Sequence, residues 1–205
     1  EGDYTFFYIL HVFGPAVAAV VMTSLTAGKA GLLELRQSLR QFRASRKWYL
    51  FILLGIPALV MFGIIAQPGA MARFKGFTPR LLIGYPISLV TVFFGVGLGE
   101  EPGWRGFALP RMQKQYGSLW GTLLLGILWS CWHLPDFLTA SKGGGEGTGL
   151  VTFFMNFSIF TLAVVSLSVI MTWLYNHTQG SLFIAILAHA SVDAPEVADW
   201  TTLFP

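Results

Sequence analysis

Long apolar runs, separated by short polar or basic stretches, make up most of the chain. Several approach the length of about 20 residues that a helix needs to cross the hydrocarbon core of a bilayer. Lipid offers no hydrogen-bond partners, so spans of this kind satisfy their backbone groups internally, as helices. The pattern predicts an all-α, polytopic transmembrane bundle of about six spans, the last of them short for a full crossing. The six runs cover approximately residues 4–27, 48–66, 81–99, 119–134, 150–175 and 181–194.

The stretch between the first two runs has a different character. Residues 29–47 contain six basic side chains against one acid, with leucines and Phe42 at roughly helical spacing. A short amphipathic helix on the membrane surface and a cytoplasmic loop both fit this composition. Either interpretation places the segment on the cytoplasmic side by the positive-inside tendency. The shorter amphipathic piece at residues 102–116 fits the same face.

The chain is divided further by a glycine-rich segment and a polar turn. Residues 142–149 contain five glycines, which predicts a flexible loop on the opposite side, serving as a gate or as a linker. A tight polar turn at residues 176–180 joins the last two runs. We expect a single integrated membrane domain without internal repeats. Its parts are the N-terminal spans with the basic segment, residues 1–80, and a catalytic core, residues 81–197.

Composition supports an integral membrane protein. The 205 residues are 54% hydrophobic and 11% charged, with a mean hydropathy of +0.63, whereas soluble domains contain about 25% charged residues. The single cysteine, Cys131, excludes a disulfide framework or a cysteine-based metal site built from this chain alone. Because the chain begins at Glu1 and enters an apolar run almost at once, we expect further residues upstream. We expect no nucleic-acid partner, and the oligomeric state is not indicated.

Ionisable residues in or beside the predicted spans are the candidate functional groups. Charges at membrane depth are costly, so they usually face a polar cavity and mark function. Each cluster alone has a structural explanation, as an interfacial anchor or as a hydrogen-bonded pair on one helical face. One catalytic site explains all the clusters together and is preferred. The clusters are Glu100 with Glu101, His133, and His189 with Asp193.

Local spacing adds detail to the first cluster. Pro102 lacks an amide hydrogen and favours the first turn of a helix, which predicts a helix start there with both carboxylates near an anion-favouring amino end. Trp129 lies four residues before His133, so its indole can pack against the imidazole and fix its orientation.

Straight spans would place Glu100 and His133 at opposite membrane faces. The site therefore requires tilted, broken or longer helices, such as a third span that continues through Pro102 with a kink.

Three spaced motifs together resemble the CAAX-protease and bacteriocin-processing family, also called the Abi or CPBP family, which includes the type II CAAX prenyl endopeptidases. The resemblance covers residues 81–195, and the string at 100–111 is similar to the bacterial branch. It implies an intramembrane protease, often called a metalloprotease, in the bacterial cytoplasmic membrane. Members commonly have more spans, phenylalanine in place of Trp129 and asparagine in place of Asp193. The motifs are Glu100-Glu101-x-x-x-Arg105, Trp129-x-x-x-His133 and His189-x-x-x-Asp193.

The resemblance implies a role for each motif residue. Glu100 and His133 would activate water, and Glu101 with Arg105 would hold that arrangement. His189 and Asp193 would stabilise the tetrahedral intermediate from the opposite helix. An ionised aspartate only accepts hydrogen bonds, so Asp193 is assigned to orienting His189 or binding a metal rather than to donating to an oxyanion.

A zinc mechanism remains open beside the metal-free one. Glu100, His133 and His189 are ligand types of catalytic zinc sites, with Glu101 as the base. The chain has no HExxH pair that would fix two ligands on one helical face. We therefore prefer a metal-free mechanism and assign no cofactor, with zinc as the alternative.

The predicted function is an intramembrane endopeptidase. It would hydrolyse a peptide bond of a membrane-associated or lipidated peptide or protein, with membrane lipids as further partners. A non-catalytic bacteriocin-immunity or binding protein with the same fold is one alternative. A proton-relay transporter is another, although repeated halves would be expected there. The residues do not select a substrate or show whether it is prenylated.

Overall fold

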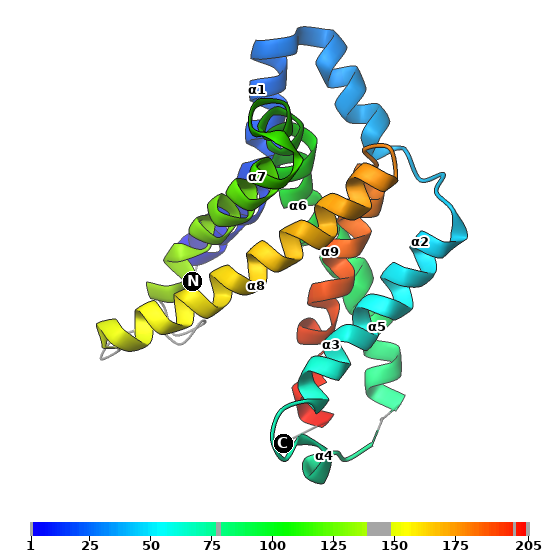
Figure 1. The fold of residues 1–205 in the computed structure, drawn as a ribbon, viewed down its shortest axis with the longest axis vertical. Coiled ribbons are helices and arrows are strands. Elements are labelled where there is room, and N and C mark those ends of the chain that lie inside the picture. Colours follow the sequence, from blue (N-terminus) through cyan, green and yellow to red (C-terminus); the bar gives the residue numbers. More distant parts are fainter. Residues whose placement is uncertain (1, 77–78, 139–148, 199, 204–205) are drawn as a thin grey trace.

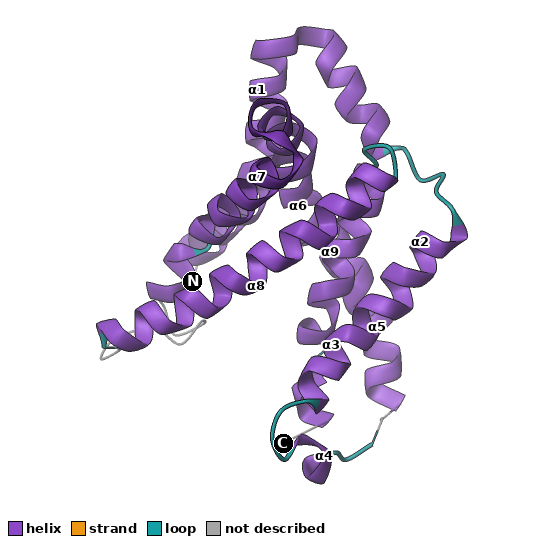
Figure 2. Ribbon diagram, in the orientation of Figure 1, coloured by secondary structure: helices purple, strands orange, loops and turns teal. Residues whose placement is uncertain are grey.

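The computed structural model describes residues 2–76, 79–138, 149–198 and 200–203. In this part of the chain the regular structure is entirely helical, joined by short loops and turns, as Figure 2 shows. The predicted all-α fold is confirmed. Except for Gly149, the predicted glycine-rich loop at 142–149 lies outside the described residues.

Helices differ widely in length, and several are interrupted by short π-helical turns (Figure 1). The α-helices are α1 (Gly2–Leu39), α2 (Arg46–Leu50), α3 (Ile56–Ile65), α4 (Ala70–Arg73), α5 (Pro79–Val92), α6 (Leu98–Glu101), α7 (Leu109–Trp132), α8 (Leu150–His177) and α9 (Leu182–Val197). The π-helical turns are η1 (Phe51–Gly55), η2 (Phe93–Gly97) and η3 (Pro102–Ala108), and the 3₁₀ turns are η4 (Leu134–Leu138) and η6 (Trp200–Leu203).

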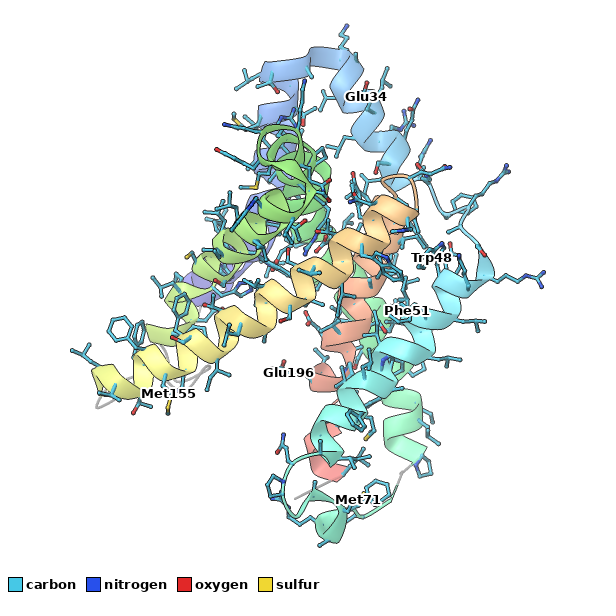
Figure 3. The ribbon with its side chains drawn as sticks, viewed as in Figure 1. Glu34, Trp48, Phe51, Met71, Met155 and Glu196 are labelled. Atoms are coloured by element: carbon cyan, nitrogen blue, oxygen red, sulfur yellow. The ribbon has the colours of Figure 1, made fainter. Side chains whose placement is uncertain are left out.

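The long helices make this an integral membrane protein. Among the described residues, four helical runs are long and apolar enough to cross a membrane: Ile9–Leu39, Arg46–Ile65, Leu82–Trp132 and Leu150–His177. All six predicted spans correspond to helices. The third and fourth share the single run of 51 residues, and α9, with 16 residues, is shorter than a full crossing. Large apolar side chains such as Met155 of α8 project outward from the helices (Figure 3), as expected for a lipid-facing surface.

A reversal at Gly117 folds the fourth predicted span back along η3 and the first part of α7. Gly117 has φ 81° and ψ 167°, a backbone conformation essentially restricted to glycine. Beyond it the chain folds back, so that a Cβ on Gly121 would lie 2.7 Å from backbone atoms of Met112. Glu100 lies 17 residues before Gly117 and His133 lies 16 residues after it. The two arms of this hairpin are therefore nearly equal, and both residues lie at a similar depth.

The predicted helix start at Pro102 is wrong. Glu101 (φ −62°, ψ −34°) and Pro102 (φ −58°, ψ −34°) both have helical backbone angles, and helix continues without a break from α5 into α7. The π-helical turn η3 changes the hydrogen-bond register where proline provides no amide hydrogen. Hence no helix amino end acts on the two carboxylates. As expected, the third span continues through Pro102.

Helix α9 occupies the centre of the bundle. It contacts α1, α3, α5 and α8 (Figure 1), and most of its side chains are buried, as expected of a helix that is apolar all round. Its first turn is capped by Ser181, whose hydroxyl accepts a hydrogen bond from the Ile184 amide at 3.1 Å. The same hydroxyl donates to the Gln41 carbonyl at 2.5 Å. The cap therefore also anchors α9 to the basic segment.

The predicted basic segment, residues 29–47, is helical at both ends and irregular between them. Residues 29–39 continue α1 after a kink at Gly28, and residues 40–45 are irregular. The Ser38 hydroxyl donates to the Gly180 carbonyl, and the Gln41 amide donates to the Thr178 carbonyl at 3.0 Å. The segment thus packs on the turn between α8 and α9. Its location on a membrane surface stays a prediction.

Helix α1 passes very close to the helical run that carries Glu100 and Glu101. A Cβ on Gly103 would lie 2.5 Å from the Pro15 carbonyl oxygen, whereas one on Gly95 would meet no atom within 4 Å. We therefore expect Gly103→Ala to lower the thermal midpoint by about 3–10 °C, through about 1–3 kcal/mol of overpacking. In Gly95→Ala the midpoint should stay the same or rise slightly, since alanine favours helix. Equal midpoints for the two purified variants would contradict this packing.

Candidate active site

The buried carboxylate of Glu101 is the centre of a polar network. Its Oε1 atom accepts a hydrogen bond from Arg105 Nη1 at 2.7 Å and lies 2.7 Å from His189 Nδ1. The side chains of Glu101 and Arg105 are both fully buried. Four residues separate them along the helical run, which places both on one face. Glu101 thus connects this run to α9.

The network continues along α9 to Asp193. His189 Nε2 lies 3.3 Å from Asp193 Oδ2, which confirms that the two residues share one helical face. Both ring nitrogens of His189 therefore face carboxylates, Glu101 on one side and Asp193 on the other. The Asp193 side chain is 35% exposed, whereas that of His189 is 4% exposed. The buried network thus reaches an accessible surface at Asp193.

Trp129 connects this network to Glu100. Its Nε1 atom donates to Glu100 Oε2 at 2.7 Å. Its ring lies under the Arg105 guanidinium, with the Cζ atom 4.3 Å from the ring centroid, and 5.4 Å from the His189 ring. From the sequence, Trp129 was predicted only to pack against the His133 imidazole. The hydrogen bond to Glu100 was missed, since only the three-dimensional hairpin brings the two residues together.

His133 follows the last residue of α7 and is positioned by the same tryptophan. Its Nδ1 atom lies 2.9 Å from the Trp129 carbonyl oxygen, and its ring packs 5.3 Å from that of Phe160 in α8. No hydrogen bond joins His133 to Glu100, both of which lie in the described part of the chain. Trp129 therefore holds both residues of the predicted water-activating pair.

A cavity of about 480 Å³ opens between α3, α8, α9 and the end of α7. Trp129, His133, His189 and Asp193 form its polar part together with Glu196, a residue that sequence reasoning missed. The rest of the lining is mostly apolar and includes the exposed Leu59 of α3. Glu100, Glu101 and Arg105 lie behind this lining. The arrangement combines a mostly apolar binding space with acid–base groups at one end.

Comparisons with known proteins point to one family. Residues 82–195 match the family model described as Type II CAAX prenyl endopeptidase Rce1-like. The chain belongs to this family. It is 25% identical over 204 residues to CAAX prenyl protease 2 of Methanococcus maripaludis, covering 92% of this chain and 72% of the relative. No solved structure gives a significant match.

Membership of the Rce1-like family makes the chain a membrane-embedded endopeptidase. The matched residues 82–195 include all three motifs from Glu100 to Asp193. The family resemblance inferred from those motifs is thereby confirmed, while placement in the bacterial branch stays a prediction. The division at residues 80 and 81 also stays a prediction, although the family match begins close to it.

The predicted zinc set does not fit a metal ion in its present arrangement. Glu100 Oε2 accepts from Trp129, and both His189 nitrogens face carboxylates, so these donors already have partners. Among the described residues, Glu100, His133 and His189 do not bring one ligand atom each to within 4.8 Å of one another. We derive no step of the reaction through a metal on these three residues.

Proposed function

We propose that this Rce1-like endopeptidase hydrolyses a peptide bond of a membrane-associated or lipidated substrate, with water activated by Glu100 and His133. One observation carries the proposal: acid–base groups from separate helices converge beside a mostly apolar cavity within membrane-spanning helices. Peptide hydrolysis needs an activated water, oxyanion stabilisation and a proton for the leaving amine. The groups around this cavity are of the types that provide all three.

The first step is proton abstraction from water. Trp129 holds Glu100 through its indole nitrogen and His133 through its backbone carbonyl. The two side chains have no direct bond, and a water molecule bridging them would satisfy both. Glu100 would take the proton as water attacks the substrate carbonyl, and the proton would then pass to the leaving amine. Positioned acid–base groups of this kind contribute about 10²–10⁴-fold to rate.

The second requirement is stabilisation of the oxyanion. Arg105 fixes Glu101, and Glu101 fixes the Nδ1 side of His189, so the Nε2 side points toward Asp193 and the cavity. A protonated imidazole donates from both nitrogens at once. It would donate from Nδ1 to Glu101 and from Nε2 to the developing oxyanion. Asp193 would orient the ring and accept the Nε2 hydrogen before substrate binds.

The cavity and the family both support a proposed substrate class. The relative in Methanococcus maripaludis is named a CAAX prenyl protease, and the cavity lies between two helices long enough to span a membrane, α8 and the run containing α3. An apolar space bounded by such helices suits a lipid-modified carboxyl-terminal peptide that arrives from the bilayer. We propose this substrate class, with the bacterial cytoplasmic membrane as the location and lipids as surrounding partners.

Ala163 of α8 lines the cavity, so blocking it tests substrate entry. Ala163→Trp should raise KM for a lipidated peptide about tenfold or more, because the indole fills space that the substrate needs. Leu162→Trp places the same side chain at an exposed neighbouring position outside the cavity lining and should leave KM unchanged. Steady-state kinetics in detergent micelles provide the measurement. Equal KM values for the two variants would contradict the assigned binding space.

The substrate class itself is tested with three synthetic peptides of one sequence. One carries a prenylated cysteine near its carboxyl end, one carries the same cysteine unmodified, and one is extended into a hydrophobic transmembrane helix. We expect purified protein in lipid vesicles to cleave the prenylated peptide with the highest kcat/KM. Equal cleavage of the prenylated and unmodified peptides would reject the lipid-modified substrate class.

A further inference from the structure

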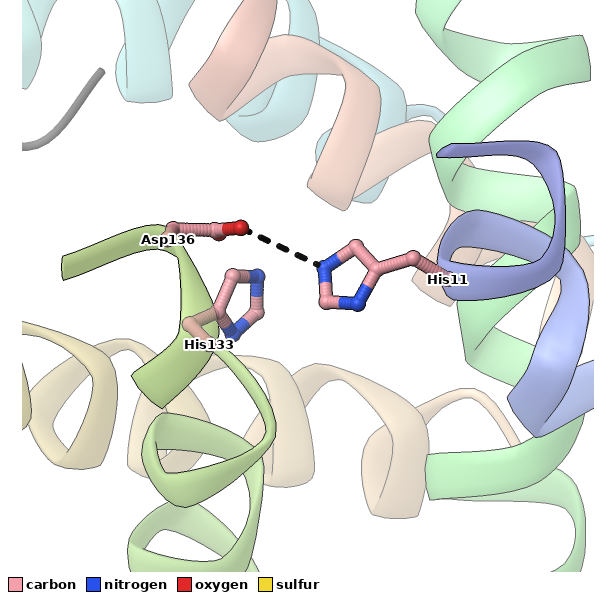
Figure 4. A group of neighbouring side chains, drawn as sticks. All are labelled: His11, His133 and Asp136. Atoms are coloured by element: carbon pink, nitrogen blue, oxygen red, sulfur yellow. Dashed lines mark ion pairs between the residues drawn. The ribbon is translucent and has the colours of Figure 1, made fainter. Parts of the chain in front are cut away.

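A second cluster of potential ligands lies at the end of α7, away from the Glu101 network. Figure 4 shows His11 of α1 facing His133 and Asp136. One donor atom from each lies within 4.8 Å of the other two. His11 Nε2 is 3.9 Å from Asp136 Oδ1, and the His11 and His133 rings are 5.9 Å apart and nearly perpendicular. Segments distant in sequence thus bring two imidazoles and a carboxylate together.

We propose that His11, His133 and Asp136 bind a divalent transition-metal ion, with zinc as the best match. Two imidazoles and one carboxylate, with water in a fourth position, form a common zinc ligand set. Zinc bonds of about 2.0–2.1 Å in a tetrahedron place ligand atoms about 3.3 Å apart. Donor atoms already within 4.8 Å of one another reach that spacing through side-chain movements of about 1 Å. Neither His11 nor Asp136 belongs to the three motifs.

The two histidines are already oriented as ligands. His133 Nδ1 lies 2.9 Å from the Trp129 carbonyl oxygen, so a hydrogen on Nδ1 donates to it and the lone pair lies on Nε2. Metal-binding histidines typically have such a bond on the other nitrogen. The His11 ring stacks on Trp132 at 5.3 Å with an interplanar angle of 6°. These contacts fix both rings before any ion binds.

The site links the N-terminal helix to the catalytic core. His11 and His133 are 122 residues apart in sequence, so an ion held by both ties α1 to the end of α7. An ion that binds only the folded protein raises its apparent stability. His133 also belongs to the proposed water-activating pair, so cleavage would require the ion-free imidazole. That last consequence rests on the proposed function, whereas metal binding does not.

The test measures metal binding directly, without an activity assay. Purified metal-free protein is titrated with Zn²⁺ by calorimetry and with Co²⁺ by visible absorption, which reports tetrahedral coordination. His11→Phe keeps a ring on Trp132 but removes the ligand, and Asp136→Asn keeps the side-chain shape. We expect each to weaken Zn²⁺ binding at least about tenfold. Excess Zn²⁺ should raise the thermal midpoint of the unsubstituted protein by about 5 °C.

His177 provides the matched control. Its Nδ1 atom lies 2.8 Å from a backbone carbonyl four residues earlier, as in His133, and it is exposed at the end of α8. His177→Phe should bind Zn²⁺ as tightly as the unsubstituted protein. The proposal is overturned if His11→Phe retains full affinity, or if His177→Phe loses as much as His11→Phe. Because the readout is binding, loss of the proposed peptidase function would leave this result unaffected.

Discussion

Replacing Glu100 with glutamine should reduce peptide cleavage by about 10²–10⁴-fold and leave the fold intact. The glutamine carbonyl can still accept the hydrogen bond that Trp129 Nε1 donates to Glu100 at 2.7 Å. It cannot take a proton from water, so only the chemical step is lost. The measurement is kcat on a lipidated peptide, together with the thermal midpoint of each purified protein.

Glu34→Gln is the matched control for this change. Glu34 is an exposed residue of α1 outside the cavity lining, and its carboxylate takes part in no hydrogen bond or ion pair within the described residues. Its replacement should change kcat less than threefold. A Glu100→Gln protein that retains most of its activity would show that water is activated elsewhere.

The second large effect concerns stability. Arg105→Met should lower the free energy of unfolding by about 3–5 kcal/mol, because it removes the guanidinium that donates to the buried Glu101 carboxylate and leaves that carboxylate with His189 alone. The Arg105 guanidinium also lies over the Trp129 ring, and that contact is lost too. Denaturant titration of the purified protein in mixed micelles provides the measurement.

Two further variants separate charge from packing. Adding Glu101→Gln to Arg105→Met removes the buried carboxylate that has lost its guanidinium and should restore part of the lost stability. Arg111→Met removes an exposed arginine that bonds the Phe107 carbonyl and the Thr26 hydroxyl and lies over the Phe107 ring, and should cost less than about 1 kcal/mol. Equal losses for Arg105→Met and Arg111→Met would contradict the buried ion pair.

The features that sequence could predict are those that depend on local spacing. Hydropathy gave the helical runs, because lipid imposes both their length and their helical form. The four-residue spacings correctly placed Glu101 with Arg105 and His189 with Asp193, since each pair lies on one helix. The family resemblance rested on the same spacings.

Other features depend on contacts between distant segments and could not be read from spacing. The reversal at Gly117 brings Trp129 back to Glu100, and a single glycine ahead of an apolar run does not specify the path of the chain. The proline at 102 suggested a helix start, but a π-helical turn accommodates it within continuous helix. His11 was not singled out, because only the packing of α1 against α7 brings it to His133.

The central claim is that residues around this membrane cavity catalyse peptide hydrolysis. Its most direct test is mass spectrometry of a prenylated carboxyl-terminal peptide incubated with purified protein in lipid vesicles prepared in ¹⁸O-labelled water. We predict cleavage at a single bond, with one ¹⁸O atom in the new carboxylate, and at least about 10²-fold less product from Glu100→Gln. Intact peptide with the unsubstituted protein, or equal product from Glu100→Gln, would show that these residues do not catalyse the cleavage.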